Sequence, residues 1–271
     1  MNSMVIAAPA SVLITCFVFI TLRYKWCLYQ GKTWYGLMAC ACIINVCINF
    51  CLIKYLHCNL VYICLLNFPL VIGEVPLSIL PFFYRDPERS TAKDRNVIIS
   101  PADGKVIYVK RVESGRIPLS VKGNDRISLE ELSGTPLLSQ GNHVIGICMN
   151  YLDVHVNRSP VNGIIRKLVH IQGTFLSLRH PESVVKNERQ TILIEGDKIQ
   201  IGVVQIASRL VRRIISYVNE GDTVISGQRI GAIRFGSQVD VIIPSTPSCN
   251  IKVKVDDVVR AGITILADFV E

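Results

Sequence analysis

A charge-poor, apolar stretch at the start of the chain limits what this sequence can fold into more than any other feature. Within it, residues 4–22 and 33–53 contain no charged side chain. Each segment matches the length of about 20 apolar residues that a helix needs to cross the hydrocarbon core of a bilayer. The sequence therefore predicts an α-helical membrane anchor over residues 1–84 and a separate soluble domain over residues 85–271.

A third apolar segment covers residues 55–73 and continues past Glu74 to Phe83. Polar and helix-breaking residues interrupt it, namely His57, Asn59, Asn67, Pro69 and Pro76. Such a segment is compatible with a third span and also with a kinked helix at the membrane interface. The anchor is therefore expected to have two or three spans.

Basic residues indicate how the anchor is oriented. The loop after the first apolar segment carries Arg23, Lys25 and Lys32, and the region after the last one carries Arg85, Arg89, Lys93 and Arg95. The positive-inside rule places both regions in the cytoplasm, which favours three spans, an outer N-terminus and Lys54 in an outer turn. Because no convincing signal-peptide cleavage site follows, we expect a retained anchor in the inner cell membrane, with the soluble domain on its cytoplasmic face.

Composition excludes several other classes of protein. Most cysteines lie among apolar residues of the anchor without zinc-ligand spacing, and only Cys148 and Cys249 lie in the soluble part. This argues against a disulfide scaffold and against a metal site. The net charge is +8, but no stripe of Arg and Lys interleaved with aromatic residues is present, so an anionic lipid surface is expected and nucleic acid is not.

The soluble part has the pattern of a mostly β domain. Short apolar runs separated by Gly, Pro, Asn and Asp are typical of strands, whereas no amphipathic helical pattern of 12 or more residues stands out. The runs are residues 97–99, 106–109, 144–149, 164–169, 191–194, 199–206 and 239–243.

An approximate repeat lies near the end of the chain, at residues 218–231 and 255–266. In each copy a turn leads into a β-branched pair, followed by a second turn with Gly and another strand. This looks like the hairpins of the barrel-sandwich fold of biotinyl and lipoyl domains. Those carriers present a modified Lys at a hairpin tip, whereas the segment between these two copies holds residues 234–240, with Gly236 and Ser237, and no Lys.

Several motifs that contain candidate catalytic residues follow one another along the soluble part. They are residues 82–89 (FFYRDPER), 100–106 (SPADGKV), 152–163 (LDVHVNRSPVNG), 187–189 (NER) and the pair Gly236-Ser237. In this order they make the chain resemble the phosphatidylserine decarboxylase family, specifically its short bacterial and archaeal branch. The resemblance runs from about Phe82 to the C-terminus.

The resemblance implies autocatalytic serinolysis between Gly236 and Ser237, which yields a β chain of residues 1–236 and an α chain of residues 237–271. The Ser237 hydroxyl attacks the carbonyl of Gly236 and forms an ester, and the lack of a side chain at Gly236 permits the backbone strain of this attack. Elimination and hydrolysis then leave a covalent pyruvoyl group, with no metal. That group forms a Schiff base with phosphatidylserine, and the products are phosphatidylethanolamine and CO₂.

The resemblance also implies roles for individual residues. His155 is the expected base for Ser237 and the proton donor in turnover, with Asp103 as its orienting carboxylate. Asp153 could equally orient His155 or cap a turn. Arg85, Arg158 and Arg189 could hold the phosphate or carboxylate of a substrate, because a guanidinium group binds either anion, although residues 187–189 could equally form a solvated loop. Taken singly, an Asp-Gly pair is typical of a turn, and a His between two Val residues is typical of a half-buried strand.

Two positions depart from the family pattern. The long-chain branch has a second histidine three residues after the first, where this sequence has Arg158. His155 must then serve both self-cleavage and turnover, or Asp153 must assist it. Gln238 stands where Thr or Arg is more familiar, and we expect this milder change to affect the site less.

Other readings of the sequence stay open at this point. A non-enzymatic membrane adaptor with lipoyl-like hairpins combines an anchor with a similar β domain, although such adaptors usually carry a long helical hairpin. A decarboxylase of archaeal-type phosphatidylserine shares all the expected chemistry. A homo-oligomer is compatible with the sequence, which sets no oligomeric state.

Overall fold

The computed structural model divides the chain into two units. The first contains Met1–Tyr84 with Asn150–Leu152, and the second contains Arg85–Met149 with Asp153–Glu271. The structure describes residues 2–26, 28–56, 60–91, 96–112, 116–118, 126–136, 142–174, 176–178, 180, 182–197, 199–208, 213–234, 237–244 and 249–269.

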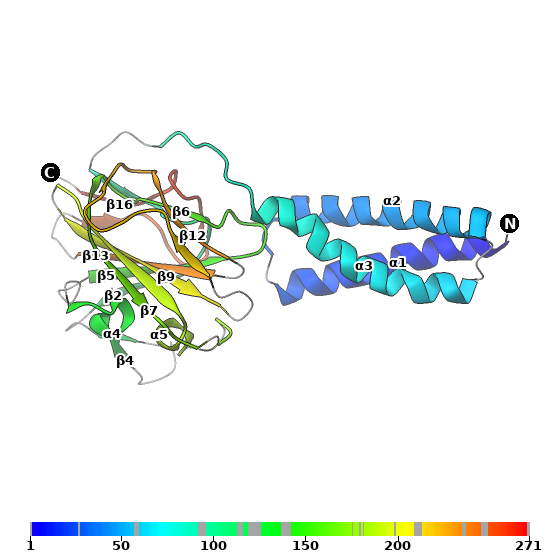
Figure 1. Ribbon diagram of the computed structural model, residues 1–271, viewed down its shortest axis with the longest axis horizontal. Helices are drawn as coiled ribbons and strands as arrows, with labels where there is room; N and C mark the ends of the chain where they lie inside the picture. The colour runs from blue at the N-terminus through cyan, green and yellow to red at the C-terminus, as the bar shows by residue number, and fades with distance from the viewer. Residues whose placement is uncertain are drawn as a thin grey trace. The chain divides into compact units, whose positions relative to one another are not determined.

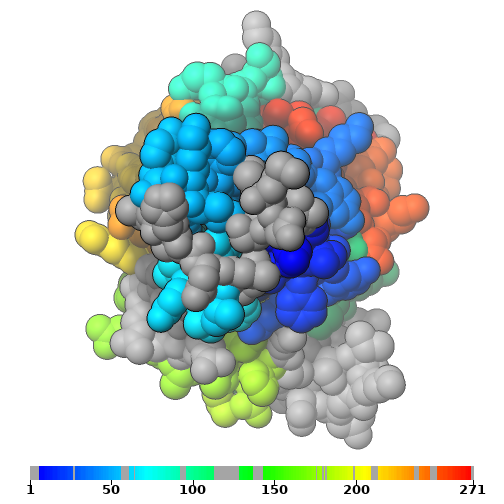
Figure 2. Space-filling view, turned by 90° about the vertical axis from the view of Figure 1, so that its right-hand side faces the viewer, coloured from blue at the N-terminus to red at the C-terminus, as the bar shows by residue number. Residues whose placement is uncertain are grey.

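The first unit is built from three apolar helices, α1 (Asn2–Lys25), α2 (Gly31–Leu56) and α3 (Leu60–Phe83). By length and composition, all three are able to cross a membrane. The third apolar segment forms one helix despite its prolines, Pro69, Pro76 and Pro81. Figure 2, which looks along the helices, shows blue α1, lighter blue α2 and cyan α3 packed against one another.

Polar side chains inside this unit hold the helices together. Asn67 on α3 accepts a hydrogen bond from Ser11 on α1 at 2.9 Å, and Asn45 on α2 donates one to Glu74 at 2.7 Å. Lipid tails are as apolar as Leu, so packing and such hydrogen bonds drive helix association in a membrane. In the same unit, the ring of Tyr151 lies 4.8 Å from that of Trp26.

The second unit is mostly β, as the short apolar runs predicted. Each of the seven runs falls on one of the strands β1, β2, β5, β7, β8, β9 and β13. The elements are β1 (Val97–Ile99), β2 (Gly104–Val112), β3 (Arg116–Pro118), β4 (Arg126–Ser128), α4 (Leu129–Ser133), β5 (Asn142–Met149), β6 (Val156–Arg158), β7 (Gly163–Ile171), α5 (Ser183–Lys186), β8 (Arg189–Glu195), β9 (Gln200–Ala207), β10 (Ile214–Ser216), β11 (Thr223–Val224), β12 (Arg229–Ile233), β13 (Ser237–Pro244), β14 (Cys249–Ile251), β15 (Val258–Val259) and β16 (Ile265–Phe269).

A large curled sheet forms the body of this unit, in the strand order β11-β7-β8-β9-β13-β5-β2-β15 (Figure 1). Two three-stranded sheets, β1-β16-β14 and β10-β12-β6, contribute to the same core as one face of the large sheet. The other face packs a smaller core with α4. Alternation along β13 explains both cores, because Val239, Val241 and Ile243 enter the first and Ile242 enters the second.

The strands form two copies of one arrangement. We define the inserted copy as residues 156–233 (β6 to β12), and the outer copy as residues 97–149 and 237–269 (β1, β2, β5 and β13 to β16). The sheet order β10-β12-β6 of the inserted copy corresponds to β14-β16-β1 of the outer copy. Likewise, β11-β7-β8-β9 corresponds to β15-β2-β5-β13, so the large sheet consists of two equivalent halves.

Register and hydrogen bonds support the same correspondence. The register of β2 shifts between Val106 and Tyr108, and that of β7 shifts at the equivalent place. The hydroxyls of Ser100 and Ser159 each donate to the carbonyl two residues on, both at 2.7 Å. Their own carbonyls accept from the amides of Gly262 and Gly227, both at 2.8 Å.

The sequence repeat near the C-terminus forms equivalent turns in the two copies. Gly221 and Asp256 have φ values of 91° and 77°, and six residues later Gly227 and Gly262 have 83° and 75°. Positive φ is accessible to Gly and, among other residues, best to Asn and Asp. The turn chemistry expected from the repeat is confirmed, while its likeness to biotinyl and lipoyl domains stays a prediction.

The inserted copy interrupts the outer copy between β5 and β13. Its own equivalent strands, β8 and β9, are separated only by residues 196–199, whereas β5 and β13 are separated by residues 150–236. The register places Val203 of β9 opposite Val241 of β13, and these two residues are also equivalent in the two copies. The copies are therefore related by a pseudo-two-fold axis at this pair.

Candidate functional site

The candidate site lies where the chain passes between the two copies. The chain leaves the outer copy after Met149 and returns to it at Ser237, and these two residues face each other in the register of β5 and β13. His155 lies in the outgoing connection, immediately before β6. Its carbonyl accepts a hydrogen bond from the amide of Ile233 at 3.1 Å, at the end of the inserted copy. Antiparallel pairing of β5 with β13 therefore brings the outgoing connection, which contains His155, and the return of the chain at Ser237 to one end of the sheet.

Ser237 is the first residue of β13, paired with Met149 on one side and Ala207 on the other. Gly236 and the side chain of Ser237 lie outside the described residues. The scissile bond expected from the sequence thus precedes a strand that is hydrogen-bonded on both sides. A break before Ser237 leaves every ladder pair of β13 in place.

The ring of His155 is buried and its tautomer follows from one contact. Nδ1 lies 2.9 Å from the carbonyl oxygen of Asp153. A carbonyl oxygen only accepts, so Nδ1 carries the proton and Nε2 carries the lone pair. Orientation of the ring thus comes from a main-chain carbonyl two residues earlier, and Nε2 is the basic atom.

Burial lowers the pKa of His155 from 6.5 to about 4. The hydrogen bond to the Asp153 carbonyl and the negative charge of Asp103 both raise this pKa, but less than burial lowers it. The ring is therefore neutral at neutral pH, which is the form that can accept a proton.

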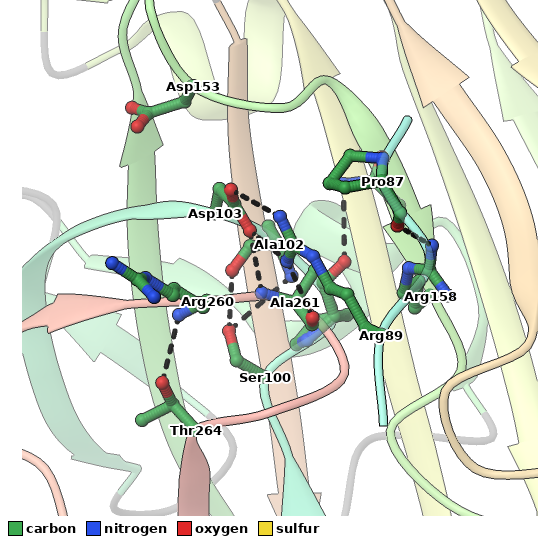
Figure 3. Close-up of polar contacts among 12 residues, drawn as sticks. Pro87, Arg89, Ser100, Ala102, Asp103, Asp153, Arg158, Arg260, Ala261 and Thr264 are labelled. Carbon is green, nitrogen blue, oxygen red and sulfur yellow. Dashed lines mark hydrogen bonds and ion pairs between the residues drawn. The ribbon is translucent and has the colours of Figure 1, made fainter. Parts of the chain in front are cut away.

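Asp103 is held by an arginine and a main-chain amide (Figure 3). Arg89 donates to both carboxylate oxygens, at 2.5 and 2.8 Å, and the Ala261 amide donates to Oδ1 at 2.8 Å. The ion pair is buried, and the Asp103 hydrogen bond raises the pKa of Arg89. Among the described residues, these are the groups that bond the carboxylate, so Asp103 acts on His155 through its charge.

The inserted copy shows which part of this arrangement the fold requires. Asn162 is equivalent to Asp103, and its Oδ1 accepts from the Ser226 amide at 2.7 Å, as Asp103 accepts from Ala261. An amide oxygen therefore suffices to hold this turn. The negative charge of Asp103 and its partner Arg89 are additions of the outer copy.

Arg158 binds the segment that follows the anchor. Its guanidinium donates to the carbonyls of Gly227 and Pro87, at 2.9 and 3.0 Å, and to the Asp86 carboxylate at 3.1 Å. Figure 3 shows the contact with Pro87. Arg229 also pairs with Asp86. These contacts give Arg158 a structural role at the position where the long-chain branch has its second histidine.

Arg189 is also engaged by the protein. It donates to the carbonyls of Leu132 and Glu131 in α4, at 2.9 and 2.7 Å, and to that of Val185 in α5. The last carbonyls of a helix lack intrahelical partners, and a basic side chain satisfies them. Arg85 is exposed at the start of the second unit, and Asp153 is buried beside His155.

Gln238, directly after Ser237, is fixed by a buried network. Its amide nitrogen donates to Asp240 at 2.7 Å and to the hydroxyl of Tyr108 at 2.8 Å, and that hydroxyl donates to Asp240 at 2.6 Å. Burial raises the pKa of Asp240 to about 6, against the lowering effect of these bonds. Tyr108 reaches β13 across Gly146, where a Cβ would lie 2.4 Å from its ring.

Sequence reasoning did not find Arg89 or Tyr108 as parts of the site. Arg89 carried a weak signal, since it ends the first family motif, but it was assigned only to the basic region near the membrane. In the described part of the chain, no three His, Cys, Asp or Glu residues are grouped so that they could hold a metal ion.

Comparisons with known proteins give the family. Residues 79–267 match the family model of phosphatidylserine decarboxylase. A provisionally named archaetidylserine decarboxylase proenzyme of Methanocaldococcus jannaschii is 43% identical over 187 residues, covering 69% of this chain and 87% of that protein. The phosphatidylserine decarboxylase proenzyme of Novosphingobium aromaticivorans is 40% identical over 196 residues, covering 72% and 73%. That of Erythrobacter litoralis is 41% identical over 192 residues, covering 70% and 73%.

A buried, neutral histidine thus lies in the connection that leaves the outer copy, and Ser237 begins the strand with which the chain returns to it. With the family match over most of the second unit, the chain belongs to the phosphatidylserine decarboxylase family. It is an enzyme of the carboxy-lyase class. The adaptor reading of the sequence is thereby wrong.

Proposed function

We propose that the chain cuts itself between Gly236 and Ser237, converts Ser237 into a covalent pyruvoyl group, and then decarboxylates phosphatidylserine to phosphatidylethanolamine and CO₂. One observation carries the proposal. The connection that contains His155 and the chain return at Ser237 lie at the same end of the β5–β13 pair, although they are far apart in sequence. The names of the relatives as proenzymes add support.

The residues present fit a pyruvoyl group at position 237. Such a group becomes the first residue of a new chain, and Ser237 already begins a strand paired on both sides. The 35 residues after the cut (271 − 236) contain β13 to β16, which pair with β5, β9, β1 and β2 of the other chain. These ladders would hold the α and β chains together without a peptide bond. The pyruvoyl group would withdraw electrons from the substrate as the substrate carboxylate leaves as CO₂.

His155 supplies the base for self-cleavage in this proposal. Nε2 takes the Ser237 hydroxyl proton, and the oxygen bonds to the Gly236 carbonyl carbon. The bond from that carbon to the Ser237 nitrogen then breaks as Nε2 gives the proton to that nitrogen. Removal of the Ser237 α-proton then expels the Gly236 carboxylate and leaves dehydroalanine, and water releases ammonia to give the ketone. Intramolecular attack by a well-placed group has effective molarities on the order of 10⁵ M or more.

Asp103 stabilises the positive charge that His155 gains during proton transfer. Since Arg89 and the Ala261 amide hold the carboxylate, its effect on His155 is electrostatic. In turnover, Nε2 of His155 would first accept a proton from the substrate ammonium group and then deliver it to the former α-carbon, which its low pKa favours. Arg158 and Arg189 support the fold around the site, and Arg85, which is exposed, is the proposed contact of a lipid phosphate.

A direct test is the mass of the two chains. Purified protein should contain a large chain that ends at Gly236 and a small chain of residues 237–271 with a pyruvoyl terminus. Intact-mass measurement separates pyruvoyl from seryl, and the small chain should resist Edman degradation. A single full-length species with unmodified Ser237 in active enzyme would falsify the proposal.

Asp103→Asn should slow self-cleavage while the domain stays folded. The amide can still accept from Ala261, as Asn162 accepts from Ser226, but the charge beside His155 is lost. We expect cleavage roughly tenfold slower, the effect of removing about 1.4 kcal/mol of charge stabilisation. The measurement is a pulse-chase of precursor and product. Asn162→Asp is the matched control and should be cut at the normal rate, and equal rates for Asp103→Asn and the native chain would contradict this role.

We also propose that the soluble domain faces the cytoplasm, beside phosphatidylserine and other anionic lipids. The basic residues of the first loop and of the region after α3 support this, together with three helices able to span a membrane. Protease added to right-side-out cells should spare the domain, and protease added to inverted vesicles should digest it. Digestion from outside in intact cells would reverse the assigned orientation.

A further inference from the structure

Two amide side chains form a buried pair inside the core of the second unit. Gln205 on β9 donates from Nε2 to Oδ1 of Asn157 on β6 at 2.7 Å, and both residues are fully buried. Asn157 in turn points Nδ2 at the carbonyl of Pro101, 3.4 Å away. A carbonyl only accepts, so this contact orients Asn157, and Asn157 then orients Gln205.

The orientation leaves one atom without a partner. Within the described part of the chain, Oε1 of Gln205 is buried and accepts no hydrogen bond. A buried acceptor left unsatisfied costs about 1–3 kcal/mol, and such atoms are rare in native structures. A group that donates a hydrogen bond to Oε1 would remove this cost.

The outer copy shows that the fold does not need these amides. Asn157 is equivalent to Ile98, because each lies two residues before the serine of its copy. Gln205 is equivalent to Ile243, since each lies two residues beyond the pair on the pseudo-two-fold axis. Both isoleucines belong to the hydrophobic core. The same packing position is thus filled by apolar side chains in one copy and by amides in the other.

The backbone leaves space for the Gln205 amide. A Cβ at Gly231 would lie 3.0 Å from Nε2 and 3.4 Å from Oε1 of Gln205, besides 2.6 Å from the carbonyl oxygen of Ile215. Gly231 pairs with Asn157, and the equivalent pair in the outer copy is Ile98 with Ala267. Glycine here accommodates a side chain that the other copy lacks.

The amide pair connects the two strands that matter for the proposed reaction. Asn157 lies two residues after His155. Gln205 lies opposite Val239 of β13, and Ala207, two residues further along β9, lies opposite Ser237. Diagonal neighbours on adjacent strands are about 7–8 Å apart, within reach of a long side chain or a small ligand.

We infer that Gln205 is a substrate-positioning residue whose Oε1 accepts a hydrogen bond from the amine nitrogen of the aminophospholipid. The carboxylate and the phosphodiester of phosphatidylserine have acceptors only, so the amine is the head-group element that supplies donors to an amide oxygen. The assignment rests on the proposed function, because the amine must react at position 237.

Gln205→Met and Gln205→Ile test the inference. Either change removes the acceptor and fills the position with an apolar group, as Ile243 does in the outer copy. We expect complete cutting, a thermal midpoint equal to or above that of the native enzyme, and a KM for phosphatidylserine about tenfold higher or more. Inhibition by phosphatidylethanolamine should weaken, whereas inhibition by phosphatidylglycerol, which lacks an amine, should not change.

Gln200→Met on the same strand is the control, since Gln200 is exposed at the start of β9, and it should leave all five measurements unchanged. Fully cut Gln205 variants with a native KM would overturn the inference. So would variants that lose cutting and thermal stability together, because the amide would then serve folding. An uncut native chain would instead refute the proposed function itself.

Discussion

Ser237→Ala should leave the chain uncut and reduce decarboxylation to background. The substitution removes the hydroxyl that attacks Gly236 and with it the source of the pyruvoyl group, so both self-cleavage and turnover are lost. The domain should still fold, because the ladder of β13 uses main-chain groups. A denaturing gel reports the cut, and release of CO₂ from carboxyl-labelled phosphatidylserine reports activity.

Ser226→Ala is a matched control for this change. Its hydroxyl is buried and has no hydrogen-bond partner in the described part of the chain, so its removal should cost little. That variant should be cut and active. Decarboxylation that survives in Ser237→Ala would rule out a pyruvoyl group at this position.

His155→Ala should accumulate the precursor, with self-cleavage slowed by about 100-fold or more, the usual contribution of a general base. Arg158 occupies the place of a second histidine and cannot accept a proton. Because alanine leaves a cavity at a buried site, His155→Gln serves as a second variant that keeps polar volume and a donor for the Asp153 carbonyl. His170→Ala, at a half-exposed histidine paired with Glu188, should be cut normally. Rapid, complete cutting of both His155 variants would transfer the role to Asp153 or Asp103.

The pH dependence gives a second check on His155. Its pKa of about 4 keeps Nε2 unprotonated, so the rate of self-cleavage should stay level from pH 8 down to about 5.5 and fall below that. A histidine of ordinary pKa would lose half its base form already near pH 6.5. The unfolded chain takes up this proton first as pH falls, so stability should decline from about pH 6.5 towards 4. A cleavage rate that halves near pH 6.5 would contradict a buried base.

Hydropathy and turn chemistry were enough to predict much of the fold. The apolar segments became α1, α2 and α3, because length and hydrophobicity act locally along a helix. All seven predicted strand runs are strands, and the repeated turns have matching positive φ values at Gly221 and Asp256. The chain divides into two compact units, of which the first contains Met1–Tyr84 with Asn150–Leu152.

The partners of the site residues could not be predicted in the same way. Asp103 and Arg89 are near in sequence, but the Ala261 amide that completes the site comes from the last turn of the chain. The acceptor for His155 is a main-chain carbonyl, which every residue carries, so no side-chain pattern marks it. Arg158 and Arg189 look like anion-binding residues in sequence, yet carbonyl groups of distant segments occupy them.

Local signals thus predicted the three apolar helices, the strands, the turns and the family motifs, since each depends on residues close together in the chain. The insertion of one copy into the other depends on pairing between β5 and β13, whose sequences are separated by residues 150–236. The register of β13 against β5 brings Ser237 opposite Met149. Its register against β9 shows that Gln205 is equivalent to Ile243 in the other copy. Such long-range pairing arises from burial of whole sheet faces, a property of the folded sheet that no short stretch of sequence contains.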